Sequence, residues 1–192
     1  MVARYILPGL LLALTTLFYA REAVYFDNGR GGVDWKIGKP QVSITNAHQG
    51  RSLAEVRQFA LMLVNRDRQL NGLAPLAENP LLSQAAQGHS QDMMTRNYYD
   101  HITPEGKTPS DRFAQISGRG GVGENIMQQT GATGVSLNYG LIERFQKSWM
   151  YSQGHRQNLL EPGYTRFGYG IVTDAITGRA YAVQQFAAPE LQ

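Results

Sequence analysis

The sequence predicts an α+β domain, because helical and extended periodicities occupy different parts of the chain. Apolar residues recur at helical spacing in several segments between about residues 52 and 149. From Phe167 to Phe186, alternating residues on either side of a Thr177-Gly178 turn predict two antiparallel strands. A hairpin is not stable alone in water, so we expect helices to cover a small antiparallel sheet in layers.

Capping signals place the first three helices. Ser52-Leu53-Ala54-Glu55 is a capping box that starts the first helix, and Asn71-Gly72 suits its end. Asn79-Pro80 begins the second helix, with asparagine as the cap and proline in the first turn. Thr108-Pro109 opens a short third helix that runs through Ile116.

A further strand is expected between the third and fourth helices. The segment Glu124-Asn125-Ile126-Met127 follows the glycine-rich stretch Gly118–Gly123 and would extend the hairpin into a sheet. A fourth helix then covers about residues 137–149. This arrangement places Glu124 in the sheet.

Composition excludes several classes of function. The net charge of +3 is spread along the chain without a block of lysine or arginine, so we expect no nucleic-acid partner. The chain has no cysteine, which rules out a disulfide scaffold, a thiolate nucleophile and cysteine-ligated zinc.

Residues 1–26 are interpreted as a signal-anchor that forms one N-terminal hydrophobic transmembrane helix. Arg4 precedes an apolar run from Tyr5 to Ala20, which would span about 24 Å as a helix. Cleavage sites are poor, because Phe18 or Arg21 would occupy a position that requires a small residue. We therefore expect a membrane-anchored protein with its domain on the periplasmic or extracellular side; secretion after signal cleavage is the alternative.

Residues 27–50 are predicted to form a glycine-rich tether, and residues 51–192 the globular domain. The tether composition buries too little apolar surface to order itself. Trp35 and Ile37 are the exceptions. They either cover the domain surface or, in the case of Trp35, dock on a membrane or a partner.

Three polar side chains, far apart in sequence, suggest one site. Glu124 lies in the glycine-hinged turn Gly121–Ile126, His101 lies upstream before Pro104, and His155 lies downstream after Gly154. Our hypothesis is that folding brings Glu124, His101 and His155 together in one cleft. His89 falls near the buried stripe of the second helix, where a histidine is more often a hydrogen-bonded structural residue.

The chain from about Ser52 to Phe186 resembles the CAP (SCP-like extracellular) superfamily in its bacterial, cysteine-free form. The resemblance implies an α-β-α sandwich with a central cleft. The matching residues, in chain order, are Asn65, Arg68, Gly72-Leu73, Pro75-Leu76, Asn79, Leu81, Ala85-Ala86, His89-Ser90, Met93, His101, Pro104, Gly106, Pro109, Arg112, Gly123-Glu124-Asn125-Ile126, Trp149, Ser152, Gly154-His155-Arg156, Asn158-Leu159-Leu160 and Phe167-Gly168-Tyr169-Gly170.

The resemblance also implies a site. In this family two histidines and two glutamates line the cleft and hold a divalent metal in some members. His101, Glu124 and His155 match three of these positions, while the fourth falls on Ser152, which supplies at most a hydroxyl. Two imidazoles and a carboxylate can ligate a metal such as Zn²⁺ with an open position for water. The alternative is a buried hydrogen-bonded network without metal.

Three functions remain open. The first is a non-enzymatic binding module whose cleft, lined by His101, Glu124, His155 and Ser152, takes a lipid, glycan or peptide. The second is an accessory subunit of a larger membrane complex with a vestigial cleft. The third is a metal-dependent hydrolase of cell-envelope substrates, which the missing second carboxylate disfavours because no obvious general base remains. We assign no catalytic residue and favour the binding module.

Overall fold

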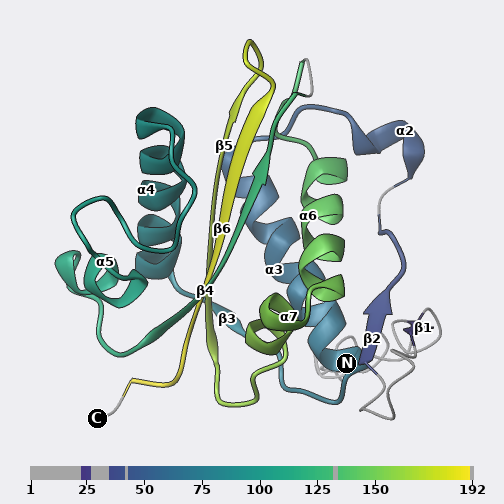
Figure 1. The fold of residues 1–192 in the computed structure, drawn as a ribbon. Helices are drawn as coiled ribbons and strands as arrows, with labels where there is room; N and C mark the ends of the chain where they lie inside the picture. Colours follow the sequence, from purple (N-terminus) through teal and green to yellow (C-terminus); the bar gives the residue numbers. More distant parts are fainter. Residues whose placement is uncertain (1–22, 27–34, 42, 132–133, 191–192) are drawn as a thin grey trace, which may run out of the picture.

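The computed structural model describes residues 23–26, 35–41, 43–131 and 134–190. Within them the chain forms three layers, a four-stranded sheet with helices on both faces (Figure 1). On one face lie α4 (Pro80–Arg96) and α5 (Pro109–Gln115). On the other lie α3 (Leu53–Leu70), α6 (Tyr139–Tyr151) and α7 (Gln153–Leu159). The predicted α+β class and its layered arrangement are confirmed.

The sheet has the strand order β3-β5-β6-β4. β5 (Arg166–Asp174) and β6 (Arg179–Ala187) form the predicted antiparallel hairpin, and β4 (Val122–Gln129) runs antiparallel along the other edge of β6. The sheet is nevertheless mixed and not purely antiparallel, because β3 (Ala77–Glu78) pairs in parallel with β5. β3 has two residues, too few to show a period, and it leads directly into the asparagine cap of α4.

Alternating glycines on β5 explain how closely α4 approaches the sheet. A Cβ at Gly168 would lie 2.2 Å from the carbonyl carbon of Leu82, and one at Gly170 would lie 2.2 Å from the backbone nitrogen of Gln87. The residues that alternate with these glycines, Phe167, Tyr169 and Ile171, point into the core under α3 and α6. The sequence alternation therefore separates a face that packs side chains from a face that meets a helix backbone.

The helices begin where the caps predict. Ser52 forms the capping box of α3 with Glu55, and the Asn79 side chain accepts from the N–H of Leu82 at the start of α4. Thr108 forms a second capping box with Asp111 at α5. α6 begins at Tyr139, two residues later than expected, because the side chain of Asn138 accepts from the N–H of Leu141 and fixes the start there.

The structure differs from the predicted tether from Trp35 onward. β2 (Trp35–Gly38) pairs antiparallel with β1 (Ala23–Phe26), and the short α2 (Ile44–Ala47) follows. Trp35 and Ile37 are buried in the main core, so this part of the chain is ordered by apolar burial that composition averaged over residues 27–50 concealed. Residues 27–34 lie outside the described residues.

The predicted N-terminal helix over residues 1–26 lies largely outside the described residues. The last four positions of that range form β1, an extended strand. Among the helices that the structure describes, none is long and apolar enough to cross a bilayer.

Candidate functional site

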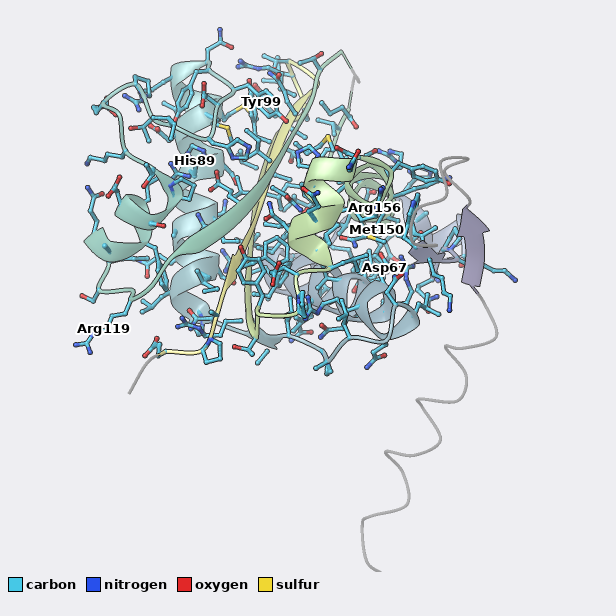
Figure 2. The ribbon with its side chains drawn as sticks, turned by 60° about the horizontal axis from the view of Figure 1, so that its bottom comes forward. Asp67, His89, Tyr99, Arg119, Met150 and Arg156 are labelled. Carbon is cyan, nitrogen blue, oxygen red and sulfur yellow. The ribbon has the colours of Figure 1, made fainter. Side chains whose placement is uncertain are left out.

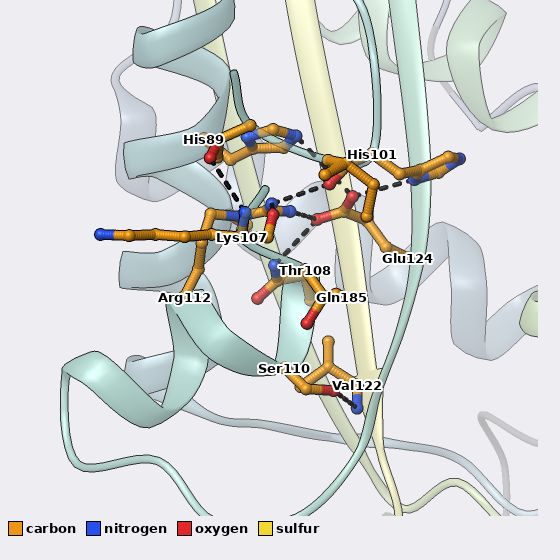
Figure 3. Close-up of polar contacts among 12 residues, drawn as sticks. His89, His101, Lys107, Thr108, Ser110, Arg112, Val122, Glu124 and Gln185 are labelled. Atoms are coloured by element: carbon orange, nitrogen blue, oxygen red, sulfur yellow. Dashed lines mark hydrogen bonds and ion pairs between the residues drawn. The ribbon is translucent and has the colours of Figure 1, made fainter. Parts of the chain in front are cut away.

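Glu124 is a buried carboxylate on β4 that holds three elements together. Its side chain is 1% exposed and lies beside Gln185, its cross-strand neighbour on β6. Oε2 accepts from Nη2 of Arg112 at 2.6 Å and from Nε2 of Gln185 at 3.0 Å. Oε1 accepts from Nδ1 of His101 at 2.9 Å (Figure 3). The carboxylate therefore joins the sheet, α5 and the loop that follows α4.

Arg112 also fixes the loop that carries His101. Its Nη1 donates to the backbone carbonyls of His101 at 2.8 Å and of Lys107 at 3.1 Å. Within the loop, Asp100 accepts from the N–H of Ile102. The Arg112 side chain is only 10% exposed, so most of it is shielded from water, although the bond to Lys107 lies at the surface. His101 is thus positioned through its backbone as well as through its ring.

The charge state of Glu124 sets the tautomer of His101. Burial alone would raise the pKa of Glu124, but the hydrogen bond from His101, the charge of Arg112 and the bond from Gln185 hold that pKa below its usual range. Glu124 is therefore an ionised acceptor, and Nδ1 of His101 must carry the donated proton. In the neutral ring Nε2 then keeps a lone pair, and the His101 side chain is 45% exposed.

His89 on α4 lies behind the carboxylate. Its Nε2 is 3.0 Å from the carbonyl of Asp100 and 3.8 Å from Oε1 of Glu124. Burial lowers the pKa of His89, and Arg112 lowers it further, while Glu124 opposes the change. A neutral ring that donates to Asp100 makes no ion pair with Glu124. This agrees with the structural role expected for His89, although its distance from Glu124 was not anticipated.

His155 belongs to α7, a helix that the sequence did not predict. Its Nδ1 lies 2.8 Å from the hydroxyl of Ser152, which begins this helix. Burial lowers the pKa of His155, and the electrostatic effect of His101 lowers it further. Ser152 supplies the hydroxyl that the sequence suggested, and it acts on His155.

Two asparagines connect α7 to β4. Nδ2 of Asn125 donates to the carbonyl of His155 at 3.1 Å, and Nδ2 of Asn158 donates to the carbonyl of Glu124 at 3.0 Å. Asn158 also donates to Oδ1 of Asn125 at 2.9 Å. Glu124 and His155 are therefore held near each other through backbone groups, whereas Glu124 and His101 meet directly.

The site contains residues that the sequence hypothesis left out. Arg112 was noted only as a matching residue, because an arginine separated by 12 positions from its carboxylate has no periodic signature. Gln185 carried a readable signal, since Gln184-Gln185 interrupts an otherwise apolar central strand, where a polar side chain needs a partner. Within the described residues, no group of three histidines or carboxylates is arranged to hold a metal ion. The ligand set His101, His155 and Glu124 stays a prediction.

Sequence comparison assigns the family. Residues 61–186 match CAP, the cysteine-rich secretory protein family. The chain belongs to the CAP family. It does so without any cysteine, as the bacterial form of the resemblance implied. CAP membership and the observed layers agree with the expected fold.

Relatives of this CAP protein include two from Bacillus subtilis (strain 168). The uncharacterized protein YkwD is 33% identical over 63% of this chain and 44% of its own length. The uncharacterized membrane protein YlbC is 32% identical over 66% of this chain and 32% of its own. The chain thus spans less than half the length of each. A crystal structure of an extracellular SCP-domain protein from Bacillus anthracis superposes with a TM-score of 0.57 at 20% identity, covering 98% of this chain and 74% of that one.

Proposed function

We propose that this protein is a membrane-anchored, extracytoplasmic binding module in which His101 and His155 contact the ligand without catalysing a reaction on it. One observation carries the proposal. Both oxygens of Glu124 are engaged by His101, Arg112 and Gln185, and its pKa is held low. Such a carboxylate is a poor general base, because its lone pairs already accept hydrogen bonds and its low pKa makes it a weak proton acceptor.

The fixed tautomer of His101 selects the ligand chemistry. Nε2 of His101 presents a lone pair, and none of the described residues occupies it, so it accepts a hydrogen bond from a ligand hydroxyl or N–H. Tyr99 and Ile102 flank His101, and both are exposed large hydrophobic residues. A polar acceptor beside apolar surface suits a glycan ring or a peptide, which combine hydrogen-bond donors with apolar faces.

A divalent metal such as Zn²⁺ would be held by Nε2 of His101 and of His155. Glu124 would orient His101 and raise the basicity of its ring, as carboxylate partners of metal-binding histidines do. To ligate the metal itself, Glu124 would first have to give up bonds to His101 or to Arg112 and Gln185. The donor set therefore supports two imidazole ligands more readily than a three-ligand site.

The sequence and the family support the proposed location. The apolar run from Tyr5 to Ala20 supports an anchor, and the match to a secretory protein family supports a domain outside the cytoplasm. Mild detergent extraction tests this together with the accessory-subunit alternative. Recovery of a lone chain with an intact N-terminus supports the binding module, whereas stoichiometric co-purification of other proteins supports the subunit.

Ligand-dependent thermal stabilisation tests the binding site. The detergent-solubilised full chain is screened against soluble oligosaccharides and short peptides, where a ligand raises stability by RT ln(1 + [L]/Kd). His101→Ala and His155→Ala should each abolish the shift. His48→Ala is the matched control, because His48 is an exposed histidine in the segment between α2 and α3. Shifts that survive both site substitutions would refute the assignment of these histidines.

A hydrolase is the second candidate, because the structure pairs His101 with Glu124 and Ser152 with His155. A carboxylate-bonded imidazole can act as a general base. His101→Ala, which removes the carboxylate-bonded ring, and His155→Ala, which removes the partner of Ser152, should then each eliminate turnover of cell-envelope peptides or glycans while the protein stays folded. Unchanged turnover in both variants excludes the mechanism.

A further inference from the structure

Residues 35–41, here called the strap, lie across α3 and α6 and continue to the N-terminal segment of the chain. The N–H of Gly38 donates to Oδ1 of Asp67 at 2.9 Å, and Nη1 of Arg66 donates to the carbonyl of Lys39 at 2.8 Å. Asn71 exchanges two hydrogen bonds with the backbone of Lys36, at 2.8 and 2.7 Å. These bonds clamp the strap onto the C-terminal half of α3.

The strap touches α7 directly. The guanidinium of Arg156 lies 4.3 Å from the centroid of the Trp35 ring, and Nη1 of Arg156 donates to the carbonyl of Met150 at 2.7 Å. Trp35 also meets the ring of Tyr151 edge-on at 5.5 Å. Arg156 is the neighbour of His155 in the chain, so this stack fixes the helix that presents His155. Figure 2 shows Asp67, Met150 and Arg156 gathered on one side of the molecule, apart from His89.

A buried chain of amide side chains forms a second connection. Oδ2 of Asp67 accepts from Nε2 of Gln146 at 2.8 Å, and Oε1 of Gln146 accepts from Nε2 of Gln184 at 2.9 Å. Oε1 of Gln184 accepts from Nδ2 of Asn125 at 3.2 Å, and the same Nδ2 donates to the carbonyl of His155. All four of these side chains belong to fully or almost fully buried residues.

The direction of this chain is set at its Asp67 end. Burial raises the pKa of Asp67, and the charge of Arg66 and the hydrogen bonds from Gly38 and Gln146 oppose that rise. As an ionised carboxylate Asp67 can only accept, so Gln146 must turn its NH₂ group toward Asp67 and its oxygen toward Gln184. Gln184 and Asn125 must then orient in the same sense, which leaves the Asn125 NH₂ group for His155. Buried polar groups are costly to leave unpaired, so a change at Asp67 that releases Gln146 is transmitted by reorientation along the chain.

We propose that the strap controls the position of α7, and with it the ligand affinity of the site formed by His101 and His155. The ligand part of this inference rests on the proposed function, whereas the positional part does not. His101 is fixed by the Glu124 cluster, on the far side of the sheet from the strap. His155 lies on α7, which the two connections join to the strap, while Asn158 and Arg68 tie the C-terminal end of α7 to β4 and α3. A partner or a pulling force that undocks the strap therefore shifts His155 relative to His101.

Hydrogen exchange and histidine NMR of the full chain in detergent test the positional part. Trp35→Ala removes the stack on Arg156. Gly38→Ala places a Cβ 2.1 Å from Nε of Arg66, so either the strap or the Arg66 side chain must move, and a move of Arg66 breaks its bonds to Asp67 and to the strap carbonyl of Lys39. In both variants we expect amides of α7 to exchange at least about tenfold faster and the ring signals of His155 to shift. The ring signals of His101 and the exchange of α4 should stay as in the wild type.

Substitutions on α6 test the amide chain separately. Gln146→Leu removes the link between Asp67 and Gln184, and we expect a shift of the His155 ring signals while the strap stays docked. Ser148→Ala is the control on the same helix, because Ser148 is exposed and bonds only within α6. Faster exchange throughout the domain would mark general destabilisation and would contradict the selective effect.

Release of the strap would be seen as fast exchange of the backbone amide at position 38 in Trp35→Ala and Gly38→Ala. The proposal is overturned if the strap is released in both variants while the amide exchange rates of α7 and the ring signals of His155 stay as in the wild type. Failure of this proposal can be told apart from failure of the proposed function. If the site binds none of the oligosaccharides or peptides, the proposed function fails, but the exchange and NMR results still test whether the strap positions α7. Where a ligand has been found, its affinity should fall at least about tenfold in both strap variants, and binding should slow exchange of the strap by linkage.

Discussion

Replacing Arg112 by methionine isolates the energetic role of the Glu124 cluster. Arg112→Met keeps most of the side-chain volume but removes the 2.6 Å bond to Glu124 and the two bonds to loop carbonyls. Glu124 is 1% exposed, so the variant leaves a buried carboxylate with His101 and Gln185 as its remaining hydrogen-bond donors. Breaking a buried charge pair in this way costs about 3–5 kcal/mol of unfolding free energy.

Urea unfolding at neutral pH measures this loss. With a slope of about 2 kcal/mol per M, the expected midpoint shift is about 2 M. Arg96→Met is the matched control, because Arg96 pairs with Asp92 and Glu105 at the surface, where solvent screens the charges, and it should change the midpoint far less. Adding Glu124→Leu to Arg112→Met should recover part of the loss, since no buried charge then lacks its partner.

The loss should also depend on pH. The folded-state pKa of Glu124 lies below its ordinary value of 4.5, so Glu124 contributes stability above that pH and loses it as the pH falls through the folded pKa. Without Arg112 the folded pKa rises, and the deficit of the variant shrinks as Glu124 becomes protonated. A deficit below about 1 kcal/mol at neutral pH, or one that stays constant into the acid range, would refute the ion-pair account.

Three further outcomes follow from the same structure. NMR titration should give His155 a pKa below its ordinary value, mainly because partial burial disfavours the charged ring, and His101→Ala should raise that pKa. Because the folded-state pKa of His155 is lowered, stability should fall as the pH drops below the ordinary value. Gly168→Ala should lower the free energy of unfolding, measured in urea, by about 1–3 kcal/mol or more, because the new Cβ meets the backbone of α4. Gly88→Ala is the control: its Cβ meets no other atom, and it should stabilise α4 by about 0.5–1 kcal/mol. Ser52→Ala should lower the thermal midpoint through loss of about 1 kcal/mol of capping energy.

Local chemistry made the helix starts predictable. Ser52, Asn79 and Thr108 each satisfy backbone N–H groups within their own first turn, so the signal lies within four residues of sequence. The hairpin of β5 and β6 was equally readable, because its alternation and its turn are both local. α7 could not be read in this way. Only Leu159 of this helix is fully buried, so it has no apolar stripe, and it is held by polar contacts to β4.

The sequence pointed to the candidate site residues but not to the residues that support them. Histidines and a carboxylate in polar motifs pointed to residues 101, 124 and 155. Arg112 and Gln185, which determine the charge and hydrogen bonding of Glu124, become visible only when α5 and β6 pack against β4. The strap was missed for a similar reason. Trp35 and Ile37 alternate around one lysine, so the strand signal consists of only two apolar residues, and their burial depends on α3 and α7.

The two histidines of the site are held by different parts of the molecule. His101 is fixed by a buried charge cluster that cannot be loosened without losing several kcal/mol of stability, so its position changes only when the domain unfolds. His155 is fixed by a helix of seven residues, a stack on Trp35 and a chain of neutral amides, all of which can break at lower cost. The affinity of a ligand that requires both rings therefore depends mainly on the position of α7. It follows that changes near the N-terminus should alter ligand affinity before they alter global stability.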